Sequence, residues 1–102
     1  MKKRNRLLDP IHPGEILLED FLKPLGISIN RLARDLHVPP NRISAIVNGA
    51  RAITADTALR LAAYFGGSAE TWLNLQADYE MRQAKRTLGR AISRQVRCRR
   101  AA

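Results

Sequence analysis

Cysteine is almost absent from this chain, since only Cys98 of its 102 residues carries a thiol. A single cysteine excludes an internal disulfide and a zinc site built on thiolates, and it fits a reducing compartment. Long apolar runs are also absent, because no stretch reaches the roughly 18 residues of a transmembrane helix. Asp9, Pro10 and His12 interrupt the apolar segment that a signal peptide would need. These absences predict a cytoplasmic protein without a membrane span.

Motifs of catalysis are missing as well. The chain has no glycine-rich phosphate loop and no nucleophile motif around its serines. His12 and Glu15 in the segment HPGE have no third metal ligand nearby, so we expect them to cap and charge the start of a helix. The sequence therefore predicts a protein that is not an enzyme and binds no metal or cofactor.

Acidic residues are missing from both ends of the chain, whose formal net charge is +9. Residues 1–6 carry four basic groups and residues 82–102 carry eight, with no acid in either segment. Residues 7–81 therefore sum to −3, although residues 28–60 within them carry +3. A basic centre inside an acidic body predicts a nucleic-acid contact at that centre. The acidic segments on either side of it are candidates for docking a basic partner.

Strand patterns are absent, and five helices separated by tight turns are predicted instead. Their boundary signals, in chain order, are Pro13 and Gly26, Ser28, the pair Asn48-Gly49, Thr54 with Gly66-Gly67, and Ser68. Each helix has apolar residues along one side, which we expect to be buried. They include Leu25 in the first helix, Leu59 in the fourth and Trp72 in the fifth. We divide the chain into a basic N-terminal arm (1–9), a five-helix domain (10–83) and a basic C-terminal tail (84–102).

The tail keeps an apolar residue at every fourth position, with Leu88, Ile92 and Val96. Gly89 and the charge density weaken this pattern and predict a frayed or conditional helix. Three roles are open for the tail: a flexible solvated end, an arm on the DNA backbone, or an amphipathic segment that orders on a partner or a membrane.

The third helix, within the segment VPPNRISAIVNGAR (38–51), has an unusual outer face. Its buried side holds Ile43, Ile46 and Val47, and the opposite side carries short polar or tiny residues. Short side chains allow close approach to a polar surface, as when the second helix of a helix-turn-helix enters the major groove. The alternative is an ordinary helical hairpin in a bundle, whose polar face binds nothing.

Under the DNA hypothesis, Asn41 can pair with adenine, Arg42 with guanine or phosphate, and Ala45 can accommodate a thymine methyl group. The residues placed for phosphate contacts or counter-charge are Ser28, Asn30, Asn48, Arg31, Arg34 and Arg51.

The segment SINRLARDLHVPPNRISAIVNGARAITADTALRLAAYFG resembles the Cro/lambda-repressor helix-turn-helix. Together with HPGE before it and WLNLQADYE after it, it resembles the HigA family of addiction-module antitoxins over roughly residues 10–85. The resemblance implies an all-α, five-helix, lambda-repressor-like fold with the helix-turn-helix at its second and third helices. It further implies a homodimer that binds a palindromic operator of double-stranded DNA and neutralises a RelE-like, mRNA-cleaving toxin.

Site residues follow from the same resemblance. The base-reading positions that it implies are Pro40, Asn41, Ser44 and Ala45, with Arg42 beside them, and the phosphate positions are Ile29 through its backbone, Asn30, Asn48 and Arg51. Two residues depart from the family pattern. His37 stands where a glycine is usual, and histidine tolerates the left-handed conformation better than most residues. Pro40 donates nothing to a base, so base recognition should shift to Asn41, Arg42 and apolar contacts.

The only tryptophan lies in the last helix, where Trp72, Leu75 and Tyr79 share one face. This face is either ordinary core packing or the seam of the two-fold dimer that a palindromic site requires. Two alternatives to the antitoxin function also remain: a stand-alone repressor without a toxin, and a protein-interaction module whose helix-turn-helix is vestigial.

Overall fold

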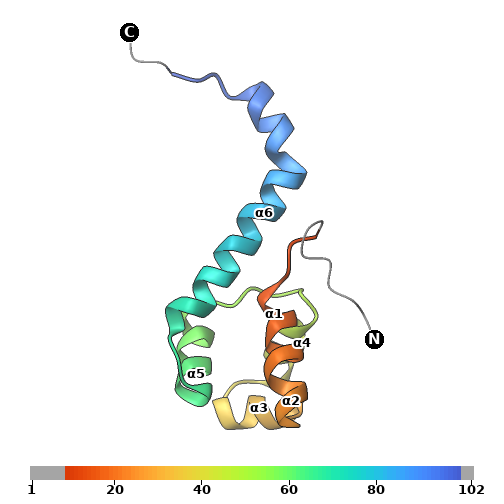
Figure 1. The fold of residues 1–102 in the computed structure, drawn as a ribbon, viewed down its shortest axis with the longest axis vertical. Helices are drawn as coiled ribbons and strands as arrows, with labels where there is room; N and C mark the ends of the chain where they lie inside the picture. Colours follow the sequence, from red (N-terminus) through yellow and green to blue (C-terminus); the bar gives the residue numbers. More distant parts are fainter. Residues whose placement is uncertain (1–8, 100–102) are drawn as a thin grey trace.

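The computed structural model describes residues 9–99, and all regular secondary structure in that range is helical (Figure 1). The elements are α1 (Pro13–Ile16), the π-helix η1 (Leu17–Leu22), α2 (Lys23–Leu25), α3 (Ile29–Leu36), α4 (Pro40–Val47), α5 (Ala55–Phe65) and α6 (Ala69–Gln95). The first three are consecutive and form the predicted first helix, so the predicted all-α fold is confirmed. Residues 1–8 of the expected N-terminal arm, and residues 100–102 of the tail, lie outside the described residues.

The first helix begins at the cap that the sequence predicted. His12 is the N-cap residue, and its Nδ1 accepts a hydrogen bond of 2.8 Å from the backbone N–H of Gly14. Gly14 itself lies against the end of α4. The packing there is so close that a Cβ atom added to Gly14 would stand 1.7 Å from the carbonyl oxygen of Ile46. The absence of a side chain at this position therefore allows the first helix and α4 to touch through their backbones.

The turn between α3 and α4 has the conformation expected for it. Ser28 caps α3, with its Oγ accepting a hydrogen bond of 3.0 Å from the N–H of Arg31. His37 ends α3 with φ 60° and ψ 46°, and it is the one non-glycine residue of the range 9–99 with positive φ. Val38 then returns to the core as its N–H donates to the carbonyl of Ala33. These local signals place α4 at an angle directly after α3.

The core lies where the helices of the body meet. Its fully buried members are Leu17, Leu32, Ala33, Ile43, Ile46, Ala58 and Leu61. The prediction for two apolar residues is wrong: Leu25 is 59% exposed and Leu59 is 63% exposed. Leu25 is the last residue of α2, directly before the left-handed Gly26. On α5 the inward positions belong to Thr57, Ala58 and Leu61, so Leu59 points away from the core.

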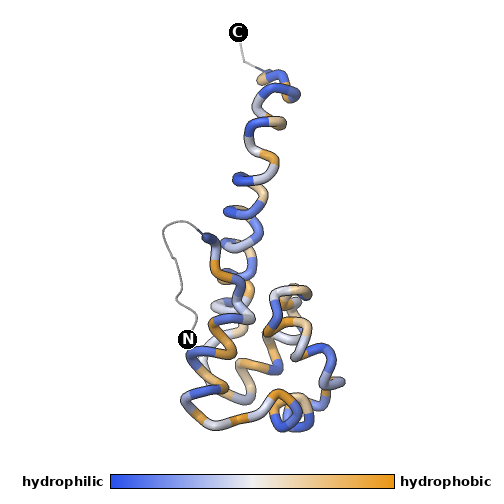
Figure 2. The backbone as a smooth tube through the Cα atoms, turned by 90° about the vertical axis from the view of Figure 1, so that its right-hand side faces the viewer, coloured by the Kyte–Doolittle hydropathy of each residue, from blue (hydrophilic) through white to orange (hydrophobic). Residues whose placement is uncertain are grey.

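Helix α6 is longer and more regular than the sequence predicted. It continues without a break to Gln95, whereas a frayed or conditional helix was expected beyond residue 84. Its first half packs on α5 and α1, and a helix that is already nucleated extends at low cost. Its second half projects well beyond the body, and apolar and hydrophilic residues follow one another along it (Figures 1 and 2). Over residues 9–99, no helix has both the length and the apolar character needed to cross a bilayer.

Candidate nucleic-acid interface

The outer face of α4 carries the residues that the sequence predicted for it. Pro40 and Asn41 are exposed in the first turn of α4, Ser44 and Ala45 are half-buried, and Asn48 is exposed at the C-cap. On the opposite side of the helix, Ile43 and Ile46 are fully buried. The structure therefore brings the predicted base-reading residues together, with one exception, Arg42.

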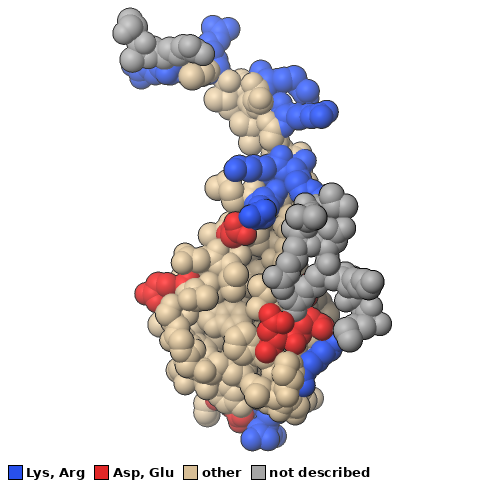
Figure 3. Space-filling view, in the orientation of Figure 1, with Lys and Arg blue, Asp and Glu red and all other residues tan. Residues whose placement is uncertain are grey.

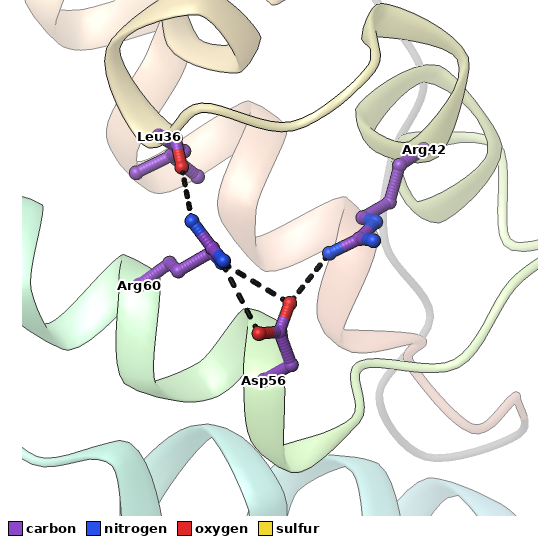
Figure 4. Close-up of polar contacts among 4 residues, drawn as sticks. All are labelled: Leu36, Arg42, Asp56 and Arg60. Atoms are coloured by element: carbon purple, nitrogen blue, oxygen red, sulfur yellow. Dashed lines mark hydrogen bonds and ion pairs between the residues drawn. The ribbon is translucent and has the colours of Figure 1, made fainter.

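Arg42 is turned away from the outer face of α4 and towards α5 (Figure 4). Its Nη1 lies 2.6 Å from a carboxylate oxygen of Asp56, in the first turn of α5, and its side chain is only 24% exposed. The Nε atom of Arg42 is buried without a hydrogen-bond partner among the described residues. The expected base contact of Arg42 is thus not what this structure presents, because a carboxylate from the next helix holds the guanidinium at the back of α4.

Asp56 is the centre of a small network that joins three helices. The carboxylate also accepts hydrogen bonds of 3.1 and 3.2 Å from Nε of Arg60, one turn later on α5. Arg60 in turn donates from Nη1 to the carbonyl oxygen of Leu36 at the end of α3, over 2.8 Å (Figure 4). Hydrogen bonds from Arg60 and then Arg42 hold the pKa of Asp56 below its usual value. The network therefore links α4 to both α3 and α5.

Only one of the two ion pairs in this network can be predicted from the sequence. Asp56 and Arg60 are four residues apart on one helix, which is a visible ion-pair spacing. Arg42 and Asp56 are 14 residues apart, and nothing in the sequence predicts their contact.

Some of the residues of α3 that were predicted to contact phosphate already have hydrogen-bond partners within the protein. Ser28 is engaged as the N-cap, and Ile29 and Asn30 follow it in the first turn. Arg31 donates from Nε to Asp35 over 3.0 Å, and Asp35 also accepts a hydrogen bond of 2.8 Å from the hydroxyl of Tyr64 on α5. Tyr64, and after it Arg31, keeps the pKa of Asp35 low.

Two other cations that the sequence predicted for phosphate contacts differ from Arg31. Arg34 and Arg51 are exposed, and within residues 9–99 neither forms an ion pair. Both flank the outer face of α4 in sequence, Arg34 before it on α3 and Arg51 after it. They are exposed cations that precede and follow, in the sequence, a face that carries no charge of its own.

The residues predicted for a dimer seam also differ from one another. Trp72 is 5% exposed and packs on Phe21 with ring centroids 5.2 Å apart, so the core-packing alternative describes it. Leu75 and Tyr79 are half-buried, and the ring of Tyr79 stands edge-on to His12 at 4.9 Å. A dimer seam centred on Trp72 would require the core of the protomer to open. Of the three residues predicted for the seam, Leu75 and Tyr79 therefore remain as candidates.

Charge is distributed unevenly over the face seen in Figure 3: acidic side chains lie on the body, and basic side chains gather along the projecting half of α6. Within the part of the chain that the structure describes, no three His, Cys, Asp or Glu side chains come together as a metal site.

Comparison with known proteins agrees with this geometry. A family model described as "Helix-turn-helix" matches residues 18–73. Virulence-associated protein I of Dichelobacter nodosus is 59% identical over 75 residues, which are 74% of this chain and 69% of that protein.

Two solved structures resemble most of this chain. An addiction module antidote protein of a HigA family from Coxiella burnetii is 50% identical, with a TM-score of 0.83, over 90% of this chain and all of that one. The Pseudomonas aeruginosa antitoxin HigA, solved with higBA promoter DNA, is 43% identical with a TM-score of 0.83, over 86% of this chain and 96% of that one.

Proposed function

This chain belongs to the helix-turn-helix family and, within it, to the group of the HigA antitoxins, and on that premise we propose that it is an antitoxin that represses its own operon. The observation that carries the proposal is the similarity to an antidote protein over 90% of the chain, including the helices that present the α4 face. The proposed place of action is the cytoplasm, where an operon and its mRNA are found.

The DNA-binding half of the proposal rests on the α4 face. Asn41, Ser44 and Ala45 would meet base edges in the major groove, because their short side chains let the helix backbone come close. Arg34 and Arg51 would hold the phosphates on either side. Arg42 would act from behind, through Asp56, by fixing the angle at which α4 enters the groove.

A palindromic operator requires two copies of α4, about 34–36 Å apart. The proposed homodimer would bury apolar surface that one protomer leaves open. Besides Leu75 and Tyr79, the projecting half of α6 exposes Met81 (58%), Leu88 (51%) and Ile92 (48%). We call these three residues the apolar stripe and propose that it belongs to the seam, because pairing with a second copy would remove their exposed apolar surface from water.

The toxin-binding half of the proposal uses a different surface. A RelE-like toxin that cleaves mRNA is expected to be basic, so it would dock on an acidic segment. The first helix carries three acidic residues, Glu15, Glu19 and Asp20, and it belongs to the body rather than to the cationic extension of α6. Glu19 is already paired with Lys23 at 2.8 Å, so a toxin cation would have to compete with that exposed pair.

The decisive experiment is co-expression of this protein with the product of a small neighbouring gene. Co-purification of the two proteins and relief of growth arrest would support the antitoxin function. If no such partner co-purifies and the protein alone retards the upstream DNA specifically in a gel-mobility assay, the stand-alone repressor is supported instead. Failure to bind that DNA more tightly than arbitrary DNA would leave an interaction module.

A double variant separates the two surfaces. Asn41→Ala with Ser44→Ala should abolish specific binding to the upstream DNA, since it removes hydrogen-bonding groups of the α4 face. Neutralisation of the toxin should be retained. Loss of neutralisation in a variant that still unfolds cooperatively would show that the two functions share one surface, and the two-surface proposal would be wrong.

A further inference from the structure

The projecting half of α6 has a second face that the proposed function does not use. Residues 82–99 contain six arginines and one lysine, and no acidic residue. Four of these arginines, Arg82, Arg86, Arg90 and Arg94, follow one another at four-residue steps. On a helix, this spacing places them in one slowly winding row, which we call the arginine ridge. The same geometry places the apolar stripe on the opposite side.

The arginine ridge differs from an ordinary solvated helix face. Solvent-exposed helices are usually supported by acidic and basic residues four apart, whereas like charges at this spacing repel each other. Two members near the body have acidic partners: Arg82 with Asp78 at 2.9 Å, and Arg86 with Asp9 at 3.2 Å. Arg90 and Arg94 form no ion pair with any residue between 9 and 99. The outer half of the ridge thus carries uncompensated charge, which a polyanion would neutralise.

The composition of this segment selects among the polyanions. Guanidinium groups bind phosphate oxygens in pairs, and six of the seven cations here are arginines. A membrane surface is disfavoured, because residues 82–99 contain no Trp, Tyr or Phe to enter the lipid interface. A second copy of the chain is disfavoured on this face, because it would bring two ridges of the same charge together. Phosphate in a nucleic acid fits all of these features.

We propose that the arginine ridge binds the phosphate backbone of double-stranded DNA without regard to sequence, as a contact surface separate from α4. From Arg82 to Arg94 the ridge is about 18 Å long, at about 1.5 Å per residue. It therefore spans about five base pairs at about 3.4 Å each. The apolar stripe on the other side remains available for the dimer seam. The inference goes beyond the proposed function, whose DNA contacts all lie around α4.

The test uses the full-length protein and a fluorescein-labelled DNA duplex of arbitrary sequence, with affinity measured by anisotropy over a range of KCl concentrations. The double variant Arg90→Gln, Arg94→Gln should bind more weakly than the unchanged protein. The slope of log affinity against log salt should fall by about 0.9 for each phosphate that is no longer neutralised, or about 2 per protomer. The matched control Arg90→Lys, Arg94→Lys keeps the charge and should keep most of the slope. Circular dichroism reports whether α6 is intact in each variant.

Several results would overturn the proposal. One is an unchanged affinity and slope in the glutamine variant, and another is an equal loss of affinity in the lysine control. Displacement of the DNA by phosphatidylglycerol vesicles, at a lipid phosphate concentration equal to that of the DNA phosphate, would assign the ridge to a membrane. The same degree of displacement by poly-glutamate would assign it to an acidic protein. Asn41→Ala should leave this arbitrary duplex bound, so failure of operator recognition at α4 and failure of the ridge are separate observations.

Discussion

Asp56 lies outside the α4 face but is connected to the helices on both sides of it. Its carboxylate binds Arg42 of α4 and Arg60 of α5, and Arg60 reaches on to the last carbonyl of α3. The orientation of a recognition helix decides which base edges its side chains meet. We therefore regard Asp56 as a positioning residue, which acts on DNA only through α4.

Replacement of Asp56 by Asn should reduce discrimination between operator and arbitrary DNA more than it reduces affinity for arbitrary DNA. The neutral amide loses the ion pairs with Arg42 and Arg60, so the half-buried guanidinium of Arg42 no longer has a carboxylate partner. Titration of both duplexes by anisotropy measures the effect. Glu19→Gln breaks an exposed pair of the same kind on the first helix, so it is the matched control and should leave discrimination unchanged. Equal discrimination in Asp56→Asn would remove the positioning role.

His12 links the stability of the protein to pH. Burial lowers the pKa of its imidazole below the ordinary value of about 6.5, and its Nδ1 must be unprotonated to accept the bond from Gly14. Between the lowered pKa and the ordinary one, the unfolded chain binds more protons than the folded one, so stability falls as the pH falls.

The Tm should therefore decrease from about pH 7.5 to about pH 5.5, the range in which an unfolded histidine gains its proton. Asparagine is also a good N-cap and does not titrate here, so His12→Asn should flatten this dependence. Thermal unfolding followed by circular dichroism at the two pH values provides the measurement. The same pH dependence in both proteins would show that another group is responsible.

At the scale of whole elements, the protein consists of a tightly joined body and a helix that leaves it. The start of the first helix touches the end of α4 through backbone atoms, with Gly14 at the contact. In the second half of α6, by contrast, a Cβ atom on Gly89 would meet nothing within 4 Å among the described residues. The same substitution should therefore have opposite effects at the two glycines.

Gly14→Ala should destabilise the fold by at least about 1–3 kcal/mol, the usual order for overpacking, since the added atom collides with a carbonyl. Gly89→Ala should stabilise the α6 helix by about 0.5–1 kcal/mol, because alanine lowers the backbone entropy cost. Urea unfolding measures the first effect and the helical ellipticity of the intact protein the second. A neutral Gly14→Ala would mean that the first helix does not rest on α4.

On the scale of the whole molecule, the elongated shape bears on the proposed homodimer. The longest extent of the protein is 57 Å against 30 and 23 Å in the other directions, and the projecting helix accounts for the difference (Figure 1). With an apolar stripe on one side and the arginine ridge on the other, this helix suits a central seam whose outer faces are cationic.

Ile92→Glu places a charge at the outer end of the proposed seam and should convert the proposed dimer to a monomer, because a buried carboxylate without a partner is costly. Light scattering after size-exclusion chromatography measures the mass directly. Gln83→Glu adds the same charge near the arginine side of the helix and should leave the mass unchanged. A dimer that survives Ile92→Glu would exclude the apolar stripe from the seam and leave Leu75 and Tyr79, nearer the body, as its candidates.

The local part of the architecture could be predicted from the sequence. The cap at Ser28, the left-handed turn at His37 and the division of α4 into a buried and an outer face all depend on residues within a few positions of one another. Such signals act through backbone conformation and helical period, which a sequence displays directly.

The sequence by itself determined that this protein is all-helical, where its turns fall and which face α4 presents, since short-range sterics and periodicity set these features. Only the tertiary structure decided that Arg42 binds Asp56 instead of facing outward, that Trp72 belongs to the protomer's own core, and that Leu59 does not. These outcomes depend on side chains brought from distant positions, and the two flanks of a helix look alike until the neighbouring helix is in place.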